Sequence, residues 1–252
     1  MAFDLARVRS AFPDRRVFWH GALGSTMIEA NRLATEGAPS GTTIGAEAQT
    51  AGQGRHGHAW HSEPGSGLYV SVILRLQLAP AILPVVTLAL GLAVNEAILK
   101  ATGLACDLRW PNDVLIESKK CAGILTELEG SAIIAGIGIN VNHSSFPAEL
   151  HSIATSLRLA GGCEYSREEL LLELLPAIDR YCMLLEKDGR APILDLFARS
   201  SSYVNGRRVC VDQDSVTLRG TTAGLAESGF LILRGDDGRD HRILAGGVRP
   251  CS

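Results

Sequence analysis

The chain has 252 residues, enough to bury a sizeable core as one large domain or as a large domain with a small appendage. Hydrophobic residues make up 46% and charged residues 20%, and the net charge is -3, so the composition excludes a disordered chain and gives no overall positive field for nucleic acid. The N-terminus lacks the apolar core of a signal peptide, and no run has the roughly 18 uncharged apolar residues of a membrane span, so we expect a cytoplasmic protein.

The N-terminal part predicts a helix, a strand and a second helix. The first helix is expected at 4–11 and the strand at 16–20. Thr26 and Glu29 form a capping-box pattern that predicts the start of the second helix. Ser25 and Thr26 place two hydroxyls at this helix N-terminus, where free backbone amides can hold a small polar group. On the pattern alone, the simpler interpretation that both are only caps is favoured.

A glycine-rich basic loop lies between two apolar runs, in the segment 42–72. It contains a formal G-x-G-x-x-G from Gly52 to Gly57, but the sequence at 68–72 that follows it has the alternation of a strand. A dinucleotide-binding Rossmann fold would need a helix there, so that fold is not indicated. The loop instead joins two strands. Its backbone amides, with Arg55 at the centre, can wrap an anion, which favours a phosphate-binding role.

The middle of the chain predicts a buried helix and a mixed sheet. The helix is expected at 84–102, packed on the sheet and ended by Gly103. Strands are expected at 108–116, where a proline interrupts the pairing, and then at 121–128 and 132–141. Polar residues at the strand edges mark where we expect the site to lie: Gln49, Asn112, Lys120 and Asn140.

The segment Trp110-Pro111-Asn112-Asp113 places a polar turn inside apolar flanks. Burying such polar groups is costly unless they bind something. Asp113 could also be a turn residue only. Trp110 is more readily explained as an aromatic residue of the core and pocket wall than as a chemical group.

The last part of the chain changes character at Ser166. Ser166 and Glu169 form a second capping box, which opens an amphipathic helix ending near Gly189, and a shorter helix follows at 192–201. Five short strands separated by glycine-containing turns are then expected between 207 and 245. Five short strands in so short a segment predict a small β-barrel.

Cysteines and histidines give no sign of a metal site. The six cysteines are scattered without a C-x-x-C pair, so free, buried thiols are expected. Cys121 lies beside candidate site residues, but no partner for a nucleophilic role is identifiable. His56, His58 and His61 lie on the glycine-rich loop without a cysteine or carboxylate in register, so we expect loop histidines facing solvent. His143 carries no signal.

Five motifs, taken in order, resemble those of the biotin protein ligases. Each is weak alone, but together, with the strand-rich tail, they cover essentially the whole chain. The motifs are Gly24-Ser25-Thr26, Gln49-Thr50-x-Gly52-x-Gly54-Arg55-x-Gly57, Trp110-Pro111-Asn112-Asp113, Lys120-x-x-Gly123-Ile124-Leu125 and Gly136-x-Gly138-Ile139-Asn140. The resemblance implies an α+β fold of the class II synthetase type. A mixed-sheet catalytic domain that binds biotin and ATP is expected at 1–203, and a small SH3-like domain at 204–252.

The resemblance also implies roles for individual residues. Ser25, Thr26 and Gln49 match positions that hold the ureido ring of biotin, while Arg55 and Lys120 match the catalytic cations beside the reactive phosphate. The full biotin-binding set is Ser25, Thr26, Gln49, Gly52, Arg55, Lys120 and Gly123. The full ATP and adenylate set is Gly54, Arg55, Trp60, Asn112, Asp113, Lys120 and Asn140.

Three positions depart from the family pattern. Many relatives have a lysine where Arg109 precedes Trp110, and the glycine-rich loop often carries further arginines where this chain has Gln53 and His58. The grip of the loop on phosphate is therefore expected to be weaker here, or dependent on pH through histidine.

The implied reaction joins biotin to ATP, with Mg²⁺, to give biotinoyl-5'-AMP. The biotin is then transferred to a lysine of the biotin carboxyl carrier protein of acetyl-CoA carboxylase. Two alternatives are a lipoate or octanoate transferase and a biotin-sensing repressor that binds DNA. Only about twenty residues precede the Gly-Ser-Thr motif, too few for a helix-turn-helix domain, so no DNA binding is expected. The edge strands carry no pattern that decides between a monomer and a homodimer.

Overall fold

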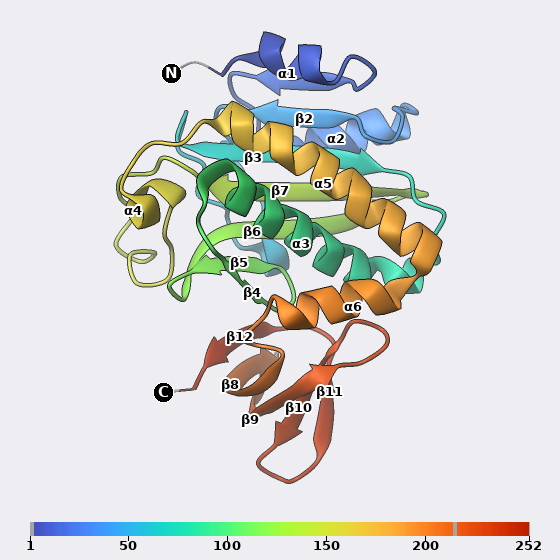
Figure 1. Cartoon of the computed structure of the whole chain (residues 1–252), viewed down its shortest axis with the longest axis vertical. Helices are drawn as coiled ribbons and strands as arrows, with labels where there is room; N and C mark the ends of the chain where they lie inside the picture. Colours follow the sequence, from blue (N-terminus) through green and yellow to red (C-terminus); the bar gives the residue numbers. More distant parts are fainter. Residues whose placement is uncertain (1–2, 214–215, 252) are drawn as a thin grey trace.

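A seven-stranded mixed sheet forms the centre of the larger part of the molecule (Figure 1). The computed structural model describes residues 3–213 and 216–251. The strand order is β1-β2-β3-β7-β6-β5-β4, with β1 and β2 parallel and the other neighbours antiparallel, so the expected mixed sheet is confirmed. The strands are β1 Val17–His20, β2 Thr43–Ala46, β3 Gly67–Leu74, β4 Asp107–Arg109, β5 Asp113–Ile116, β6 Lys119–Glu129 and β7 Ala132–Asn140.

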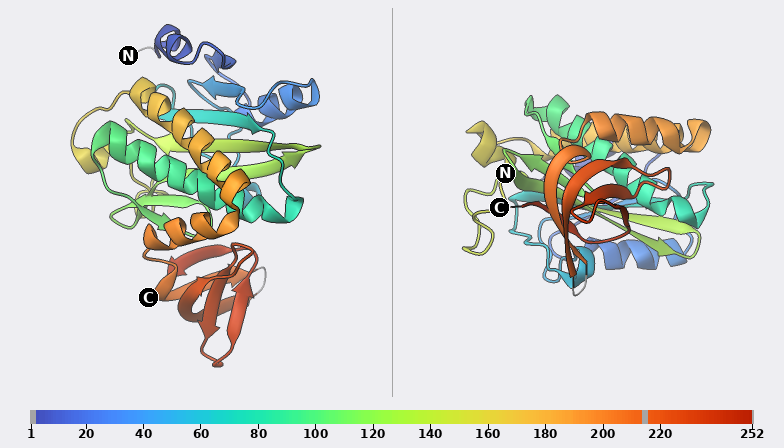
Figure 2. Two further views of the ribbon diagram at one scale, coloured as in Figure 1. Left: turned by 45° about the vertical axis from the view of Figure 1, so that its right-hand side comes forward. Right: turned by 90° about the horizontal axis from the view of Figure 1, so that it is seen from below.

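Helices cover both faces of this sheet. Helices α3 and α5 lie together over one face and α2 lies against the other, as the two views of Figure 2 show. The helices are α1 Leu5–Ala11, α2 Thr26–Thr35, α3 Leu83–Thr102, α4 Leu157–Gly161, α5 Arg167–Asp188 and α6 Arg190–Arg199, with short 3-10 turns at Arg55–Gly57 and Pro80–Ile82. The larger core lies under α3 and α5 because their apolar faces pack there with the sheet.

Helix α3 is the buried helix that the sequence predicts. Its 20 residues have a mean hydropathy of 1.5, so length and composition alone would allow a membrane span. Most of that stretch is buried inside the protein, however, including Val85, Leu88 and Ala93. The helix therefore serves as the central core element, and it ends at Gly103 in the left-handed conformation that favours glycine.

Of the two predicted helix starts, the one at α2 is wrong and the one at α5 is confirmed. The Thr26–Glu29 capping box is wrong, because Ser25 is the N-cap: its hydroxyl accepts a hydrogen bond from the Met27 amide, and Thr26 is already helical. Ser166 caps α5 as predicted, accepting from the amide of Glu169. Helix α4 was not anticipated, and α6 lies two residues earlier than expected.

A second, five-stranded antiparallel sheet follows α6 and lies below the first sheet in the left view of Figure 2. Its strands are β8 Asn205–Gln213, β9 Val216–Leu225, β10 Leu231–Gly235, β11 Asp240–Ile243 and β12 Gly247–Pro250, in the order β11-β10-β9-β8-β12. The expected break at Gly220 is wrong, because β9 runs through it. A Cβ at Gly220 would lie 2.3 Å from the carbonyl oxygen of Arg234, so this glycine permits close strand packing. The last strand, β12, was missed.

The expectation that all cysteines are free is also wrong. Cys210 on β8 and Cys251 after β12 form a disulfide, with their Cα atoms 5.2 Å apart. The antiparallel pairing of β8 with β12 brings these residues together, which no spacing in the sequence indicates. The other four cysteines, Cys106, Cys121, Cys163 and Cys182, are free.

Candidate active site

The glycine-rich loop folds back on itself as a narrow hairpin between β2 and β3. The amide of Trp60 donates to the carbonyl of Gly52 at 2.9 Å, and the amide of Gly54 donates to the carbonyl of His58 at 2.7 Å. A Cβ at Gly52 would lie 2.8 Å from the Trp60 carbonyl, so a side chain there would push the hairpin apart. The hairpin holds Arg55 and Trp60 over the central sheet.

A chain of hydrogen bonds forms one end of the site. The Thr26 amide donates to Oε1 of Gln49 at 2.8 Å, and the Thr26 hydroxyl donates to the same oxygen at 3.1 Å. Ser71, on β3 and fully buried, donates to the Thr26 hydroxyl at 2.8 Å. Nε2 of Gln49 donates in turn to Ser62 at 3.1 Å. The start of α2, β3 and the glycine-rich loop thus present a fixed set of polar groups.

A cluster of charges forms the other end. The ammonium of Lys120 lies 2.5 Å from Oδ1 of Asp113, and the guanidinium of Arg109 donates to Oδ2 at 2.7 and 3.2 Å. Burial raises the pKa of Asp113, but the two cations outweigh it and hold that pKa below its usual value. The guanidinium of Arg55 donates to Oδ1 of Asn112 at 3.2 Å, and burial lowers the pKa of Arg55. Asp113 is therefore more than a turn residue.

Two glycines let the indole of Trp60 lie close to the sheet. A Cβ at Gly138 would lie 2.5 Å from the Trp60 ring, and a Cβ at Gly123 would lie 2.9 Å from that ring and from the Lys120 side chain. The ammonium of Lys120 lies 5.3 Å from the centre of the ring, within reach of a cation-π interaction. Nε1 of Trp60 is buried and has no hydrogen-bond partner within the described ranges.

Two cavities meet at this cluster. The first, of about 50 Å³, reaches from the Thr26 end to Lys120, and the second, of about 470 Å³, lies beyond it, a volume typical of ligand pockets. Gly246 and Gly247, just before and in β12, line the second cavity, so the small sheet borders it. Five residues contribute to the lining of both cavities: Gly54, Arg55, Trp60, Asn112 and Lys120.

The structure brings together almost all of the predicted site residues. The residues expected to bind biotin line the first cavity, except Gly52, which lines neither cavity but shapes the hairpin. Those lining it are Ser25, Thr26, Gln49, Arg55, Lys120 and Gly123. The residues expected at the nucleotide, Gly54, Arg55, Trp60, Asn112, Asp113, Lys120 and Asn140, line the second.

Sequence reasoning missed two residues of the site. Ser71 is the lone polar residue of an otherwise apolar strand, which is a signal that could have been used. Arg109 was treated only as a departure from the family pattern, whereas it shares the Asp113 carboxylate with Lys120. Cys121, by contrast, is buried, and a hydrogen bond with Cys106 and burial raise the pKa of its thiol well above the usual value, so it stays protonated.

Comparisons with known proteins find relatives of this chain by sequence. The model of the biotin/lipoate A/B protein ligase family matches residues 23–144. The bifunctional ligase/repressor BirA of Bacillus subtilis is 37% identical over 89% of this chain and 71% of its own length. The biotin–[acetyl-CoA-carboxylase] ligase of Paracoccus denitrificans is 32% identical over 85% of this chain and 92% of its own.

The fold matches a solved structure over nearly its whole length. The biotin protein ligase from Aquifex aeolicus, in complex with biotin and ATP, superimposes with a TM-score of 0.83 at 30% identity, covering 94% of this chain and 99% of that one. Sequence and fold point to the same group of enzymes. The chain therefore belongs to the biotin/lipoate A/B protein ligase family, and within it to the biotin protein ligases.

Proposed function

We propose that this enzyme activates biotin with ATP to biotinoyl-5'-AMP and transfers the biotin to a lysine of the carrier protein of acetyl-CoA carboxylase. The observation that carries the proposal is the meeting of two cavities at Arg55 and Lys120. Two cations at that junction would neutralise a carboxylate from one cavity and a phosphate from the other. The Aquifex relative holds biotin and ATP, and the Paracoccus relative is named for acetyl-CoA carboxylase.

The first cavity suits the two ends of biotin. Its ureido ring needs hydrogen-bond donors and acceptors, which Thr26, Gln49 and the start of α2 supply. Its carboxylate would then reach Lys120. A lipoate would place an apolar ring against the same polar groups and leave them unpaired, so the geometry favours biotin over lipoate. The cavity is narrow, so biotin binding requires the Trp60 hairpin to move outward.

The first half-reaction needs positioning more than proton transfer. At pH 7 the carboxylate of biotin is already ionised, so its oxygen attacks the α-phosphorus of ATP directly; a new O–P bond forms and pyrophosphate leaves with the electrons of the broken P–O bond. Arg55 and Lys120 stabilise the added charge at the crowded phosphorus, each by roughly 2 to 4 kcal/mol. Burial of Arg55 strengthens this effect, since water screens it less.

Mg²⁺ fits this site as part of the MgATP substrate. Asp113 is the one carboxylate lining either cavity within the described ranges, and Lys120 and Arg109 already share its two oxygens. Mg²⁺ commonly binds through substrate phosphates, one or two protein oxygens and water, which agrees with this sparse donor set. Bound there, the ion would neutralise phosphate charge, and Asp113 and Asn140, which line the second cavity, would supply protein oxygens.

In the second half-reaction, the amine of the acceptor lysine attacks the carbonyl of biotinoyl-AMP. An amide forms, AMP leaves, and the proton is lost to water. We propose a two-domain division for this task, with a catalytic domain at 1–203 and a small domain at 204–252 that borders the nucleotide cavity through Gly246 and Gly247. We also infer that the reaction takes place in the cytoplasm, where ATP is supplied.

The proposal is tested by incubating the purified protein with biotin, ATP and Mg²⁺, with lipoate in a parallel tube, and measuring the acyl adenylate by mass spectrometry. Biotinoyl-AMP alone is expected. Lys120→Ala should reduce its formation by about 100-fold or more while keeping the fold. Lys119→Ala is the matched control, because Lys119 lies next to it on β6 but is exposed and outside both cavities. Near-normal adenylate formation by Lys120→Ala would refute the assignment of its role.

A further inference from the structure

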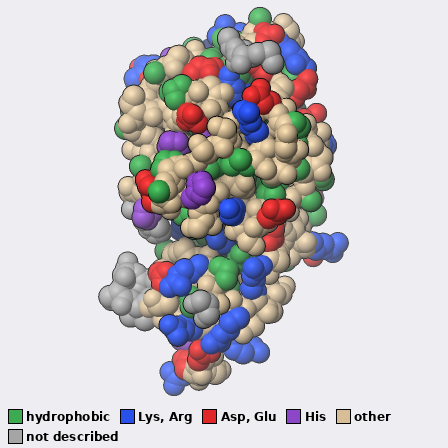
Figure 3. Space-filling model, turned by 90° about the vertical axis from the view of Figure 1, so that its left-hand side faces the viewer, with side chains coloured by type: hydrophobic (Ala, Val, Ile, Leu, Met, Phe, Trp, Pro, Cys, Tyr) green, Lys and Arg blue, Asp and Glu red, His purple; other side chains and the backbone are tan. Residues whose placement is uncertain are grey.

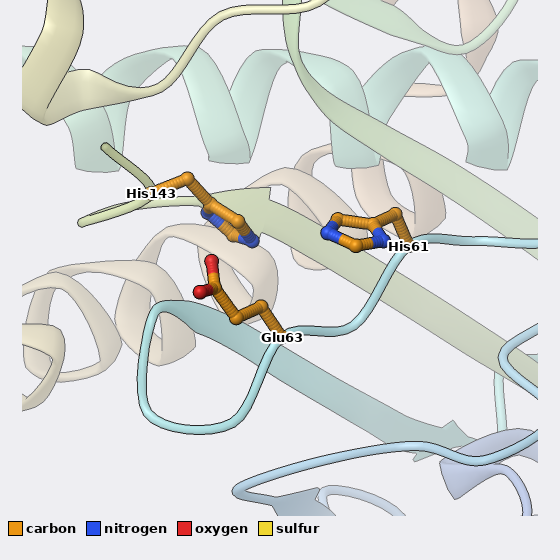
Figure 4. Close-up of side chains that lie close together, drawn as sticks. All are labelled: His61, Glu63 and His143. Carbon is orange, nitrogen blue, oxygen red and sulfur yellow. The ribbon is translucent and has the colours of Figure 1, made fainter. Parts of the chain in front are cut away.

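Three metal-binding side chains meet beside the nucleotide cavity. His61, Glu63 and His143 each offer one ligand atom, and these atoms all lie within 4.8 Å of one another. Figure 4 shows the ring of His61 and the carboxylate of Glu63 turned toward the ring of His143. Histidine side chains are visible at mid-height on the face drawn in Figure 3, above the small sheet. Sequence spacing does not predict this cluster, because His143 lies far along the chain from His61 and Glu63.

Strand register explains why these residues meet. The first residue of β3, Gly67, pairs with the last residue of β7, Asn140. The segment before β3, which carries His61 and Glu63, therefore lies at the same end of the sheet as the segment after β7, which carries His143. The amide of Asn142 donates to the carbonyl of Ser66 at 2.6 Å and ties the two segments together.

His143 is fixed in the core and keeps a ring nitrogen that no protein group occupies. Its side chain is fully buried. The Tyr69 hydroxyl, which lies 3.1 Å from the carbonyl of Glu63, is 3.2 Å from Nε2 of His143 and holds the ring beside that residue. Nδ1 of His143 is buried and has no hydrogen-bond partner within the described ranges, as a buried nitrogen that serves as a ligand would.

We propose that His61, Glu63 and His143 bind a Zn²⁺ ion. Two neutral imidazoles and one carboxylate form a donor set that Zn²⁺ accepts with a fourth position left for water, whereas Mg²⁺ prefers oxygen ligands alone. Atoms bound to Zn²⁺ at about 2.0 to 2.1 Å lie roughly 3.4 Å apart in a tetrahedron, so the three donors, now within 4.8 Å of one another, must draw together by up to roughly 1.4 Å. His61 and Glu63 lie on an irregular segment that can make this adjustment, while His143 stays fixed in the core.

A metal ion bound at this site would link the end of the glycine-rich loop to the segment after β7. His61 follows Trp60 directly and lines the nucleotide cavity, so a bound ion would join the end of the hairpin to the end of β7. An ion bound only by the folded chain also raises stability. Binding and stability, both measured without substrates, are therefore the readouts, and the result is separate from the proposed ligase activity.

In the test, the 252-residue chain is treated with a chelator, the chelator is removed, and Zn²⁺ is titrated into the protein in a calorimeter without nucleotide. One Zn²⁺ per chain and a higher unfolding midpoint are expected. His61→Ala and Glu63→Gln should each weaken affinity by about 100-fold or more, beyond the 10- to 100-fold typical of losing a residue that only supports a ligand. His151→Ala is the control, since His151 is exposed and outside the cluster, and should bind as the wild type does.

Several outcomes would overturn the proposal. One is that the wild-type chain takes up no Zn²⁺. Another is that His61→Ala and Glu63→Gln bind Zn²⁺ unchanged, as they would if free cysteines were the true ligands. Cation binding that requires ATP would assign the three residues to the nucleotide site instead. The two tested variants change partly or fully exposed side chains, so misfolding is not expected to obscure the result, and circular dichroism checks this.

Discussion

The ammonium of Lys120 lies 2.5 Å from a carboxylate oxygen of Asp113. Arg109 occupies the second oxygen of the same carboxylate, so Asp113 fixes where the lysine side chain stands. Lys120 lines both cavities, so in the proposed reaction its position decides how well it reaches the reacting carboxylate and phosphate. We therefore propose that Asp113 acts through Lys120 as a positioning residue.

Asp113→Asn is expected to lower the rate of adenylate formation by about 10- to 100-fold, because the amide keeps the size of the side chain but loses the charge that holds Lys120. The effect should appear in kcat more than in the KM for biotin, measured by pyrophosphate release. Asp107→Asn is the control, since Asp107 bonds the amide and hydroxyl of Ser202 away from both cavities. Equal losses in the two variants would mean that Asp113 is only structural.

Gly138→Ala is expected to raise the KM for biotin by about tenfold or more. The added Cβ would lie 2.5 Å from the Trp60 indole, in the wall of the first cavity that Gly138 lines, and would take up space that biotin needs even when the hairpin has moved outward. Steady-state kinetics at several biotin concentrations measure this effect. Gly21→Ala is the matched control, because nothing lies within 4 Å of its Cβ position. An unchanged KM in Gly138→Ala would show that biotin does not lie against this part of the sheet.

Ser71→Ala should raise the KM for biotin by about 5- to 10-fold and leave kcat unchanged. Its hydroxyl donates to Thr26, which in turn donates to Gln49, so its loss leaves a buried hydroxyl misoriented at a cost of about 1 kcal/mol. A split between KM and kcat separates this role from a general loss of stability. A fall in kcat with constant KM would contradict it.

The elements with local signals were predictable from sequence. Helix α3 follows from an apolar run closed by Gly103, and helix α5 from the Ser166 cap. The glycine-rich loop was recognised as a strand connection because strand-like residues follow it. The cap of α2 was assigned to the wrong one of two neighbouring hydroxyl residues. Thr26 fits the capping-box spacing, but Ser25 has the extended backbone that a cap needs.

Contacts set by strand register were not predictable. Ser71 reaches Thr26, and His143 meets His61, only because segments distant in sequence come together in the fold. Arg109 differs, because it lies four residues from Asp113 and faces it directly in the pairing of β4 with β5. For the two distant pairs the sequence offers no such short spacing. No local spacing carries that information. The motifs supplied the candidate site residues through family resemblance, and the fold then showed which neighbouring residues orient them.

The disulfide determines how many cysteine thiols react with a thiol reagent before and after reduction. Unfolded without reductant, the chain should expose four thiols to a thiol reagent, and all six after reduction. Reduction, or Cys251→Ser, should lower the free energy of unfolding by about 2 to 4 kcal/mol, because the bond from Cys210 to Cys251 closes a loop over a separation of 41 residues. Cys163→Ser, at an exposed free cysteine, should have no such effect. Six reactive thiols before reduction would disprove the bond.

His143 predicts a loss of stability in mild acid. Its folded pKa of about 4 lies below the ordinary 6.5, so between these values the unfolded chain binds a proton that the folded chain does not. The contribution of His143 to the free energy of unfolding is therefore fully present above pH 6.5, and it is lost as the pH falls toward 4. For this group alone, the loss between pH 7 and pH 5 should be about 2 kcal/mol.

Urea unfolding at pH 7 and pH 5, with a chelator present to remove metal, measures this loss. His143→Gln should flatten the pH dependence, because the amide cannot take up the proton, even if the variant is less stable at both values. His151→Gln serves as the control, since that exposed ring lies outside the cluster and should leave the slope as it is in the wild type. If the free energy of unfolding of the wild type and of His143→Gln fell equally between pH 7 and pH 5, protonation of His143 would not be the cause of the loss, and other titrating groups would have to account for it.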